Sequence, residues 1–453
     1  MANALIILAA GQGTRMNSDL PKVLHQVGRA PLVAHALAAG RALEPERIIA
    51  VTGHGADLVE KAIGQWAPDA QYVRQAEQLG TGHAVAQALP LLEGFDGRVI
   101  VLYGDTPFIR PETLDALAAS DAAVAVLGFV AADPGRYGRL IAQGPALERI
   151  VEYKDASESE RAIRLCNSGV IACDAVLLTE LVQGLSNDNA AGEYYLTDIV
   201  GAARARGLSA EVVTCDEAET LGINTRAELA RAEALFQTRQ RNDALENGVS
   251  MADPDSVYFA LDTYLGRDVT VGPNVVFGTG VTVESGASIE AFCHLEGCHI
   301  SRGATIGPFA RLRPGAELAE DVHVGNFVEV KNATLAEGVK VGHLTYLGDA
   351  EIGARTNIGA GTITCNYDGV FKHRTVIGED AFIGSSTMLV APVTIGARAL
   401  TGSGSVITKN VPDDALSVAR GQQVNKPGLA RKLMTMLREE KARRAAAKSE
   451  KKG

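Results

Sequence analysis

Several features are scarce in this sequence of 453 residues. No apolar run approaches the roughly 18 residues that cross a membrane, and no basic residue precedes the short apolar stretch 4–10, so a secretory signal is not expected. The six cysteines stand far apart without a Cys-x-x-Cys pair, which argues against a zinc site, a redox motif or a disulfide framework. We therefore expect a cytoplasmic protein with reduced thiols and no stable membrane association.

Positive charge and aromatic residues are also scarce. The chain has 43 basic and 54 acidic residues, and its net charge of −11 argues against a general nucleic-acid binder. The segment 426–453 is the exception, with ten basic and three acidic residues. Aromatic residues make up 5% of the chain, whereas 48 glycines indicate a regular, turn-rich architecture in part of it. Hydrophobic residues, at 46%, are enough for a real core, and the length suggests two or three domains.

The first half alternates short apolar runs with helix-like stretches. This alternation predicts a doubly wound, Rossmann-like α/β domain, in which ligands bind beyond the carboxyl ends of the strands. The predicted strands are Leu5–Ala9, Ile48–Val51, Val99–Leu102 and Ala122–Val130, and the predicted helices are Pro31–Leu43, Ala56–Trp66, Thr81–Leu92 and Pro111–Ala119.

The residues that follow two of these strands point to phosphate chemistry. Gly11 and Gly13 let the backbone approach a ligand, and Arg15 and Lys22 add cations. The dinucleotide fingerprint is incomplete, and the Gly-Lys-Ser/Thr of a P-loop is absent, so a plain tight turn is the alternative interpretation. Asp105 follows the strand Val99–Leu102, where a carboxylate can hold Mg²⁺ together with phosphate oxygens, although a turn or cap role is the alternative.

Longer motifs in this half resemble the sugar nucleotidyltransferase family. The string Leu8-Ala-Ala-Gly-Gln-Gly-Thr-Arg-Met16, followed by Pro21-Lys22, carries the resemblance. Further segments make residues 1–226 similar to the uridylyltransferase half of the bacterial bifunctional enzymes that make UDP-N-acetylglucosamine: 75–81, 103–105, 137–138, 152, 167–169, 192–195 and 222–224. Gln12 stands where relatives often carry Lys, so this loop offers the phosphates one charge fewer.

The resemblance implies in-line attack by N-acetylglucosamine 1-phosphate on the α-phosphorus of UTP, with release of pyrophosphate. Because the attacking phosphate is already an anion, positioning and charge neutralisation are the main tasks. Arg15 and Lys22 would neutralise UTP, and Asp105 and Asn224 would hold Mg²⁺. The residues implied to bind the nucleotide and the sugar are Leu8, Ala9, Ala10, Gly11, Lys22, Gln75, Gly80, Thr81, Tyr103, Gly104, Asp105, Gly138, Glu152, Asn167 and Asn224.

A six-residue apolar period fills the second half. Of 23 positions from Val271 to Ile407, 21 are apolar and only Thr364 and Thr401 are not. Such a hexapeptide repeat predicts a parallel β-helix in which three hexads form one triangular coil. The spacing falls to five at 295→300, 330→335 and 347→352, and the wider gap between Thr364 and Ile377 predicts a projecting loop of about seven extra residues. Before the repeat, a capping box at Thr225 and Glu228 predicts a spacer helix over 226–247.

Polar residues at the corners of the predicted prism favour chemistry over a purely structural role. Arg311, Arg313 and Lys331 offer cations for a sugar phosphate, and His343 stands near a break in the repeat with Tyr346. Across residues 251–425 the chain resembles the acetyltransferase half of the same bifunctional enzymes. That resemblance implies a left-handed β-helix and a homotrimer whose acetyltransferase sites are shared between neighbouring subunits.

In this resemblance His343 is the general base that takes a proton from the 2-amine of glucosamine 1-phosphate, a role that suits an imidazole at neutral pH. The amine then attacks acetyl-CoA directly. The residues implied to hold the sugar phosphate are Arg313, Lys331, Tyr346, Asn357 and Lys372. Those implied to contact acetyl-CoA are Ala360, Asn366, Tyr367, Ser385, Ser403 and Arg420, with Ser403 in place of an expected Ala.

We therefore predict a bifunctional enzyme that acetylates glucosamine 1-phosphate and then forms UDP-N-acetylglucosamine, a precursor of peptidoglycan and lipopolysaccharide. The expected organisation is a uridylyltransferase domain (1–226), a linker helix (227–250), an acetyltransferase β-helix (251–425) and a basic tail (426–453). Within the tail, Leu429–Lys448 is expected to be a helix that packs on the end of the trimer, and binding to a membrane surface is the alternative. One alternative is a nucleotidyltransferase whose β-helix serves only for assembly. Another is a non-catalytic sugar-nucleotide sensor, against which the intact set of Lys22, Asp105 and Asn224 argues.

Overall fold

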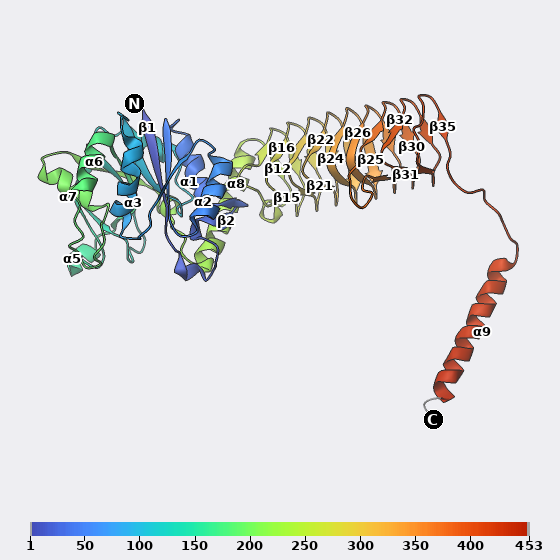
Figure 1. Ribbon diagram of the computed structural model, residues 1–453, viewed down its shortest axis with the longest axis horizontal. Coiled ribbons are helices and arrows are strands. Elements are labelled where there is room, and N and C mark those ends of the chain that lie inside the picture. Colours follow the sequence, from blue (N-terminus) through green and yellow to red (C-terminus); the bar gives the residue numbers. More distant parts are fainter. Residues whose placement is uncertain (1, 451–453) are drawn as a thin grey trace. The chain divides into compact units, whose positions relative to one another are not determined.

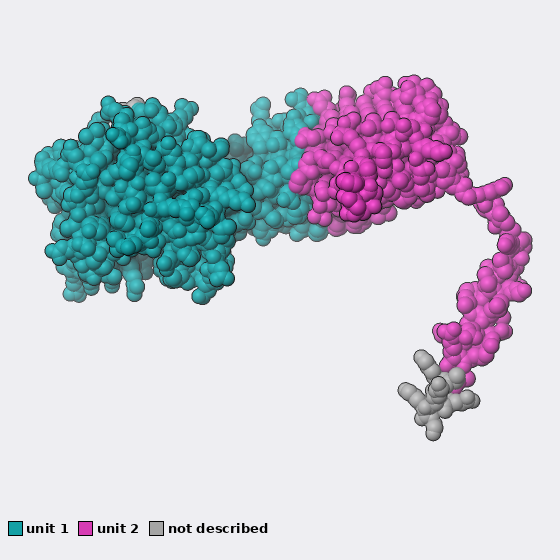
Figure 2. Space-filling model, in the orientation of Figure 1, with its two compact units in different colours: residues 1–302 teal, residues 303–453 magenta. Residues whose placement is uncertain are grey.

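A computed structural model describes residues 2–450, apart from the side chains of residue 445 and residues 447–450. The chain divides into two compact units, residues 1–302 and residues 303–453 (Figure 2). Unit 1 contains the α/β sheet, a long helix and the first turns of the hexapeptide repeat. Unit 2 contains the rest of the repeat and the C-terminal helix. Among residues 2–450, no helix is both long enough and apolar enough to span a bilayer.

A nine-stranded mixed sheet organises unit 1, in the order β5-β4-β1-β6-β10-β7-β11-β9-β8. Four of its strands run parallel side by side, namely β5 (Gln71–Arg74), β4 (Arg47–Thr52), β1 (Asn3–Ala9) and β6 (Arg98–Tyr103). The strand β10 (Leu165–Asp174) is antiparallel to β6 and to β7 (Val124–Val130), and β11 (Ala210–Cys215) is parallel to β7. A hairpin of β8 (Arg139–Gln143) and β9 (Ala146–Val151) closes one edge. The four predicted strands are β1, β4, β6 and β7, and the other five were not predicted.

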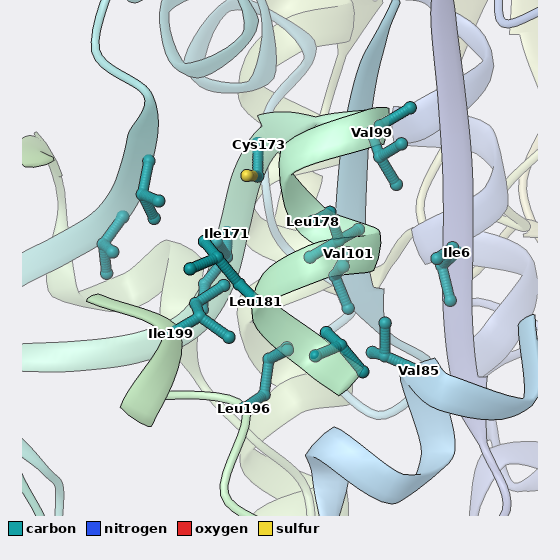
Figure 3. Close-up of a cluster of buried hydrophobic side chains, with 14 of the residues drawn as sticks. Ile6, Val85, Val99, Val101, Ile171, Cys173, Leu178, Leu181, Leu196 and Ile199 are labelled. Atoms are coloured by element: carbon teal, nitrogen blue, oxygen red, sulfur yellow. The ribbon is translucent and has the colours of Figure 1, made fainter. Parts of the chain in front are cut away.

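Helices cover both faces of this sheet, which is why its central strands read as continuous apolar runs. One buried cluster joins the strands to α3 (Thr81–Ala88), α6 (Ala175–Gln183) and α7 (Asp198–Ala205). Figure 3 shows Val85, Leu178 and Ile199 from these helices around the strand residues Val101 and Ile171. The other cluster joins the opposite face to α1 (Leu32–Arg41), α2 (Ala56–Trp66) and α4 (Pro111–Ala118).

The predicted helix boundaries agree with these elements except at one place. The stretch predicted as one helix, Thr81–Leu92, is α3 followed by a 3₁₀ turn, η3 (Leu89–Leu92). Pro90 lies in that turn, and proline cannot donate the backbone hydrogen bond that an α-helix needs there. A single-turn helix, α5 (Glu158–Arg161), completes the α/β part.

The long helix α8 (Arg226–Glu246) has the predicted capping box. The Glu228 N–H donates to Thr225 Oγ1 over 3.2 Å, and the Thr225 N–H donates to the Glu228 carboxylate over 2.9 Å. Within unit 1 the buried Gln237 side chain bonds both backbone groups of Phe259, each over 2.8 Å. The helix therefore fixes the start of the repeat region as well as connecting it.

The repeat forms the predicted parallel β-helix of short strands. In unit 1, β14 (Thr270–Val271) pairs with β17 (Ser288–Ile289), with Thr270 opposite Ser288 one full coil later. In unit 2, β24 (Glu329–Leu335) pairs with β26 (Tyr346–Ile352), and Val330 lies opposite Leu347, a slightly shorter coil that agrees with the five-residue spacings. β26 then pairs with β29 (Thr375–Ile377), with Ala350 opposite Thr375, a longer coil that contains the projecting loop. Figure 1 shows the strands of unit 2 stacked coil upon coil from β21 (Arg311–Leu312) to β35 (Leu416–Ser417).

The two polar exceptions in the apolar series are buried and satisfied. Thr364 Oγ1 accepts from the Gly348 N–H over 2.7 Å and lies 3.1 Å from the Gly348 oxygen, to which it can donate. Thr401 Oγ1 accepts from the Gly384 N–H over 3.0 Å. Because buried hydroxyls need such partners, threonine is tolerated at these inward positions.

Close stacking of the coils predicts a stability effect at Gly325. A Cβ added there would lie 1.9 Å from the Gly342 carbonyl oxygen, which is backbone and cannot move aside. Overpacking of this kind costs about 2–3 kcal/mol, so Gly325→Ala should lower the thermal midpoint of the β-helix by roughly 5–10 °C. Calorimetry tests this, with Gly342→Ala as the control because a Cβ there meets nothing within 4 Å. Equal effects of the two variants would contradict the stacking explanation.

The basic tail forms the helix α9 (Leu429–Glu450), in agreement with the predicted helix. Its apolar side chains Leu429, Leu433, Met436 and Leu437 are exposed in this single chain. Packing of the tail on a trimer therefore stays a prediction.

Candidate functional sites

The carboxyl ends of β1, β5 and β6 meet around a cavity of about 310 Å³. Ten residues implied for nucleotide binding line it: Leu8, Ala9, Ala10, Gly11, Lys22, Gln75, Gly80, Thr81, Tyr103 and Asp105. Four further lining residues were not predicted, namely Val23, Gln78, Ala84 and Glu193. The position matches the rule that open α/β sheets bind ligands beyond their strand ends.

The glycine-rich loop is shaped by close contacts. Gly13 has φ of +64°, and a Cβ there would lie 2.5 Å from Lys22 Cβ, so the loop requires glycine at that place. Met16, in the place of the third glycine of a dinucleotide fingerprint, is fully buried and serves the core. Gly104 donates its N–H to the Leu8 carbonyl over 3.0 Å, which ties the two predicted motifs together.

A cation position lies at the edge of this cavity. The Lys22 ammonium contacts the Asp105 carboxylate and donates to Asn224 Oδ1 over 3.1 Å. Arg15 donates to the same Asn224 oxygen over 2.9 Å. One carboxylate oxygen and one amide oxygen thus converge on a positive group, and these are donors that suit Mg²⁺. Within residues 2–450 no three His, Cys, Asp or Glu side chains gather as a metal site, so phosphate oxygens would have to complete the coordination.

Gly138, Glu152 and Asn167, which the family resemblance implies for sugar binding, lie beside this cavity but do not line it. The Asn167 N–H donates to the Gly138 carbonyl over 2.8 Å, and a Cβ on Gly138 would lie 3.3 Å from the Glu152 carboxylate. The ring of Tyr103 lies against Gly169, where a Cβ would approach it to 2.7 Å. Burial raises the pKa of Tyr103, so its hydroxyl stays protonated where the two groups of residues adjoin.

The carboxyl of Glu152 should make the stability of the folded protein depend on pH. Its burial raises the pKa of the carboxyl, although a 3.3 Å hydrogen bond from the Thr197 hydroxyl opposes the shift. Because the pKa of this carboxyl in the folded state lies above the unfolded value of about 4.3, ionisation of Glu152 destabilises the folded protein. The cost begins above the unfolded pKa and is complete above the folded pKa. At pH values below both pKa values there is no cost. Glu152→Gln should therefore raise the melting temperature near pH 7 but not near pH 4, while it raises the KM for the sugar phosphate. The exposed Glu148→Gln is the control, and an equal gain at both pH values would contradict this account.

In unit 2, His343 ends the strand β25 (Lys340–His343) and is exposed. Its Nδ1 lies 2.5 Å from Asn326 Oδ1. Because an amide oxygen only accepts, this contact places the imidazole proton on Nδ1 and leaves Nε2 with a free lone pair. Asn326 was missed, although it stands one short coil before His343 and the two are in register. The pair has the form of a general base with a fixed tautomer.

Three cations lie close together near this corner. The positive charges of Lys372 and Arg313 lower the pKa of Lys331. Arg313 pairs with Glu329 over 2.7 Å, and Lys372 lies 4.0 Å from Asp349. Repulsion among the three cations makes the cluster suited to an anion such as a sugar phosphate.

Asp349, which was not predicted, organises the polar residues of the same cluster. It accepts from Asn332 Nδ2 over 2.5 Å and contacts the side-chain amide of Asn366. A Cβ on Gly348 would meet both the Tyr346 hydroxyl and the Asn366 amide, so these two side chains adjoin. The backbones of Tyr367 and Lys372 form an isolated antiparallel β-bridge at the base of the projecting loop. Asn357 begins the next strand, β27 (Asn357–Ile358).

Four of the six residues implied for acetyl-CoA follow one corner of successive coils, namely Ala360, Ser385, Ser403 and Arg420. The Ser386 N–H donates to the Ala360 carbonyl over 2.7 Å, and the Gly404 N–H donates to the Ser385 carbonyl over 2.8 Å. The Arg420 guanidinium donates to the Ser403 carbonyl over 2.6 Å. The corner begins beside His343, whose carbonyl accepts from the Gly361 N–H over 3.3 Å. Such a row suits a long, extended ligand.

Both halves match known families. Residues 5–168 match the MobA-like NTP transferase domain, and residues 374–409 match the bacterial transferase hexapeptide with six repeats. "Bifunctional protein GlmU" of Paracoccus denitrificans (strain Pd 1222) is 70% identical over 438 residues, which cover 97% of this chain and 98% of that protein. The protein of the same name from Ruegeria sp. (strain TM1040) is 64% identical over 98% of this chain and 100% of that protein.

The chain belongs to the GlmU family. Membership confirms the predicted fold class, a Rossmann-like nucleotidyltransferase domain followed by a left-handed β-helix of hexapeptide repeats. It also confirms the predicted pair of activities in UDP-N-acetylglucosamine synthesis, acetyl transfer and uridylyl transfer. The GlmU match does not support the alternative in which the β-helix serves only for assembly, nor the non-catalytic sensor.

Proposed function

We propose that the cavity beyond β1, β5 and β6 binds UTP, with Arg15 and Lys22 against the phosphates. Asp105 and Asn224 are the protein ligands of Mg²⁺, a proposal supported by the convergence of both side-chain oxygens on the Lys22 ammonium. When bound, the metal supplies charge neutralisation at the phosphates. The remaining residues of the cavity hold the uridine, and Gly138, Glu152 and Asn167 hold N-acetylglucosamine 1-phosphate, so that its phosphate oxygen meets the α-phosphorus in line with the departing pyrophosphate.

In the β-helix, His343 Nε2 removes a proton from the 2-amine of glucosamine 1-phosphate as the amine attacks the thioester carbonyl. The new C–N bond forms, the C–S bond breaks, and coenzyme A leaves as its thiol. Arg313, Lys331 and Lys372 hold the 1-phosphate. Tyr346 and Asn357 orient the sugar, Asn366 and Tyr367 contact the acetyl group, and Ala360, Ser385, Ser403 and Arg420 contact the coenzyme. The observation that carries this assignment is the Asn326 contact, which leaves Nε2 free to accept.

One preparation tests both activities. The protein is incubated with acetyl-CoA and glucosamine 1-phosphate, and the sugar is followed by mass spectrometry. UTP and Mg²⁺ are then added and pyrophosphate is measured. Chelation of Mg²⁺ should stop the second reaction and leave the first unchanged. Pyrophosphate release that survives chelation would overturn the metal assignment.

We also propose that the protein is a homotrimer with acetyltransferase sites shared between subunits. Phe309 and Phe327 stack at 5.2 Å on one corner, and with Leu344 they are 46%, 55% and 61% exposed. Large apolar side chains so exposed and so close to His343 are typical of an interface. Sedimentation velocity tests the trimer, and a monomer at assay concentrations would overturn it.

The functional boundaries stay as proposed from the sequence: 1–226, 227–250, 251–425 and 426–453. The division between compact units falls at residue 302, inside the repeat, because the first coils pack with α8. The cytoplasmic location likewise stays a prediction.

A further inference from the structure

One polar side chain of the nucleotide cavity is held by a residue outside it. Gln75 follows β5, its N–H donates to the Thr52 carbonyl over 2.8 Å, and the residue is 4% exposed although it lines the cavity. A side chain so buried cannot exchange its hydrogen bonds for water, so its contacts decide what it offers to a ligand.

The amide nitrogen of Gln75 makes two hydrogen bonds inside the protein. Nε2 donates to the Gly80 carbonyl over 3.1 Å and to His83 Nδ1 over 3.1 Å. A carbonyl oxygen only accepts, so the nitrogen and not the oxygen of the amide must face Gly80. The Gly80 carbonyl is held in its direction, because it also accepts from the Ala84 N–H over 3.1 Å at the start of α3. Among residues 2–450, Oε1 of Gln75 has no hydrogen-bond partner and remains as an acceptor.

The His83 ring must accept at Nδ1 for this arrangement to hold. A neutral imidazole carries one proton, which then lies on Nε2. Nε2 of His83 lies 3.2 Å from the amide nitrogen of Gln87, which also donates to the His83 carbonyl over 3.3 Å. Gln87 is half-buried on the same helix, so its amide can reverse and accept the Nε2 proton at the loss of that long contact. The Tyr194 ring packs beside the imidazole, with centroids 6.4 Å apart. His83 therefore fixes the orientation of Gln75 without lining the cavity.

We propose that His83 is a positioning residue that makes the site select uracil over cytosine. The proposal rests on the proposed function, in which the cavity holds uridine. Uracil offers an N3–H donor to the free Gln75 oxygen, whereas cytosine has an unprotonated N3 acceptor at the same place. To suit cytosine, the Gln75 amide would have to reverse, which sets its oxygen against the Gly80 carbonyl and breaks both nitrogen bonds. A site built for a donor strongly rejects an analogue that lacks it.

The test compares kcat/KM for UTP and CTP in wild type, His83→Leu and His83→Asn. Leucine fills the space but cannot accept, so the UTP/CTP ratio should fall at least about tenfold, with a higher KM for UTP and an unchanged KM for N-acetylglucosamine 1-phosphate. Asparagine can place an oxygen near the position of Nδ1 and should retain most of the ratio. Gln87→Ala is the matched control, because it removes the contact to Nε2 and leaves Nδ1 with Gln75.

Several results would overturn the proposal. They are an unchanged ratio in His83→Leu, an equal loss of activity toward both nucleotides, or the same fall in ratio in Gln87→Ala. The unchanged KM for N-acetylglucosamine 1-phosphate shows that the α/β domain of the variant is folded. Failure of the proposed function is separate, because it would appear as a wild-type protein that does not turn over UTP.

Discussion

His343→Ala should abolish acetyl transfer and leave uridylyl transfer at its wild-type rate. General-base catalysis contributes about 10²- to 10⁴-fold, and the side chain that bonds His343, the amide of Asn326, is not basic enough to replace its Nε2. The side chain is exposed in the single chain, so its truncation leaves no cavity in the core of the β-helix. The sugar product is followed by mass spectrometry and pyrophosphate is measured in parallel on the same preparation.

The neighbouring Asn326 provides a graded comparison. Asn326→Ala keeps the imidazole but frees its tautomer, so we expect a loss of roughly tenfold, smaller than that of His343→Ala. Asn326→Asp retains an accepting oxygen and should keep most of the activity. Acetyl transfer within about tenfold of wild type in His343→Ala would show that His343 is not the base. Loss of both activities would point instead to a folding defect.

Asp105→Asn should have the converse effect, with uridylyl transfer reduced on the order of 10²- to 10³-fold and acetyl transfer retained. Asparagine keeps the shape of the side chain but removes the one carboxylate that converges with Asn224 on the cation position. Mg²⁺ prefers a charged oxygen, so the remaining activity should need a higher metal concentration. Pyrophosphate release measured across a Mg²⁺ titration checks both the rate and the shift.

A second carboxylate near the phosphate loop serves as the control. Asp19 is exposed, and Asp19→Asn makes the same change of charge without touching the cavity. If both variants lose activity equally, the effect is one of overall charge. If Asp105→Asn shows an unchanged dependence on Mg²⁺, then Asp105 does not hold the metal.

The repeat was the easiest part of the fold to predict, because every coil places an apolar side chain at the same inward-facing positions. The series from Val271 to Ile407 located the strands, and the wide gap after Thr364 located the projecting loop. In the first half, β1, β4, β6 and β7 were found as apolar runs. The central strand β10 was missed because Asn167, Ser168 and Gly169 interrupt its apolar residues. The strands β5, β8, β9 and β11 were missed because they alternate polar and apolar residues or lie near the sheet edge.

The site residues that were missed act through partners from other segments. Asn326 and Asp349 are polar residues without a motif of their own, and they matter because a neighbouring coil brings them to His343 and Asn366. The register between coils would have found Asn326 once the coil length was known. His83 shows the opposite case, since its role depends on which nitrogen faces Gln75, and no spacing in the sequence reports that.

The register of the strands also bears on how the chain folds. In the β-helix Val330 pairs with Leu347, so a coil can close as soon as the short segment between them is available. In the α/β sheet Leu5 pairs with Ile100 and Val124 pairs with Ala210, so closure must bring distant segments together. Short loops close faster than long ones, and stacked repeats add to a neighbour already formed. The β-helix should therefore grow one coil at a time, while the nucleotide-binding sheet has to wait for most of its own length before its cavity exists.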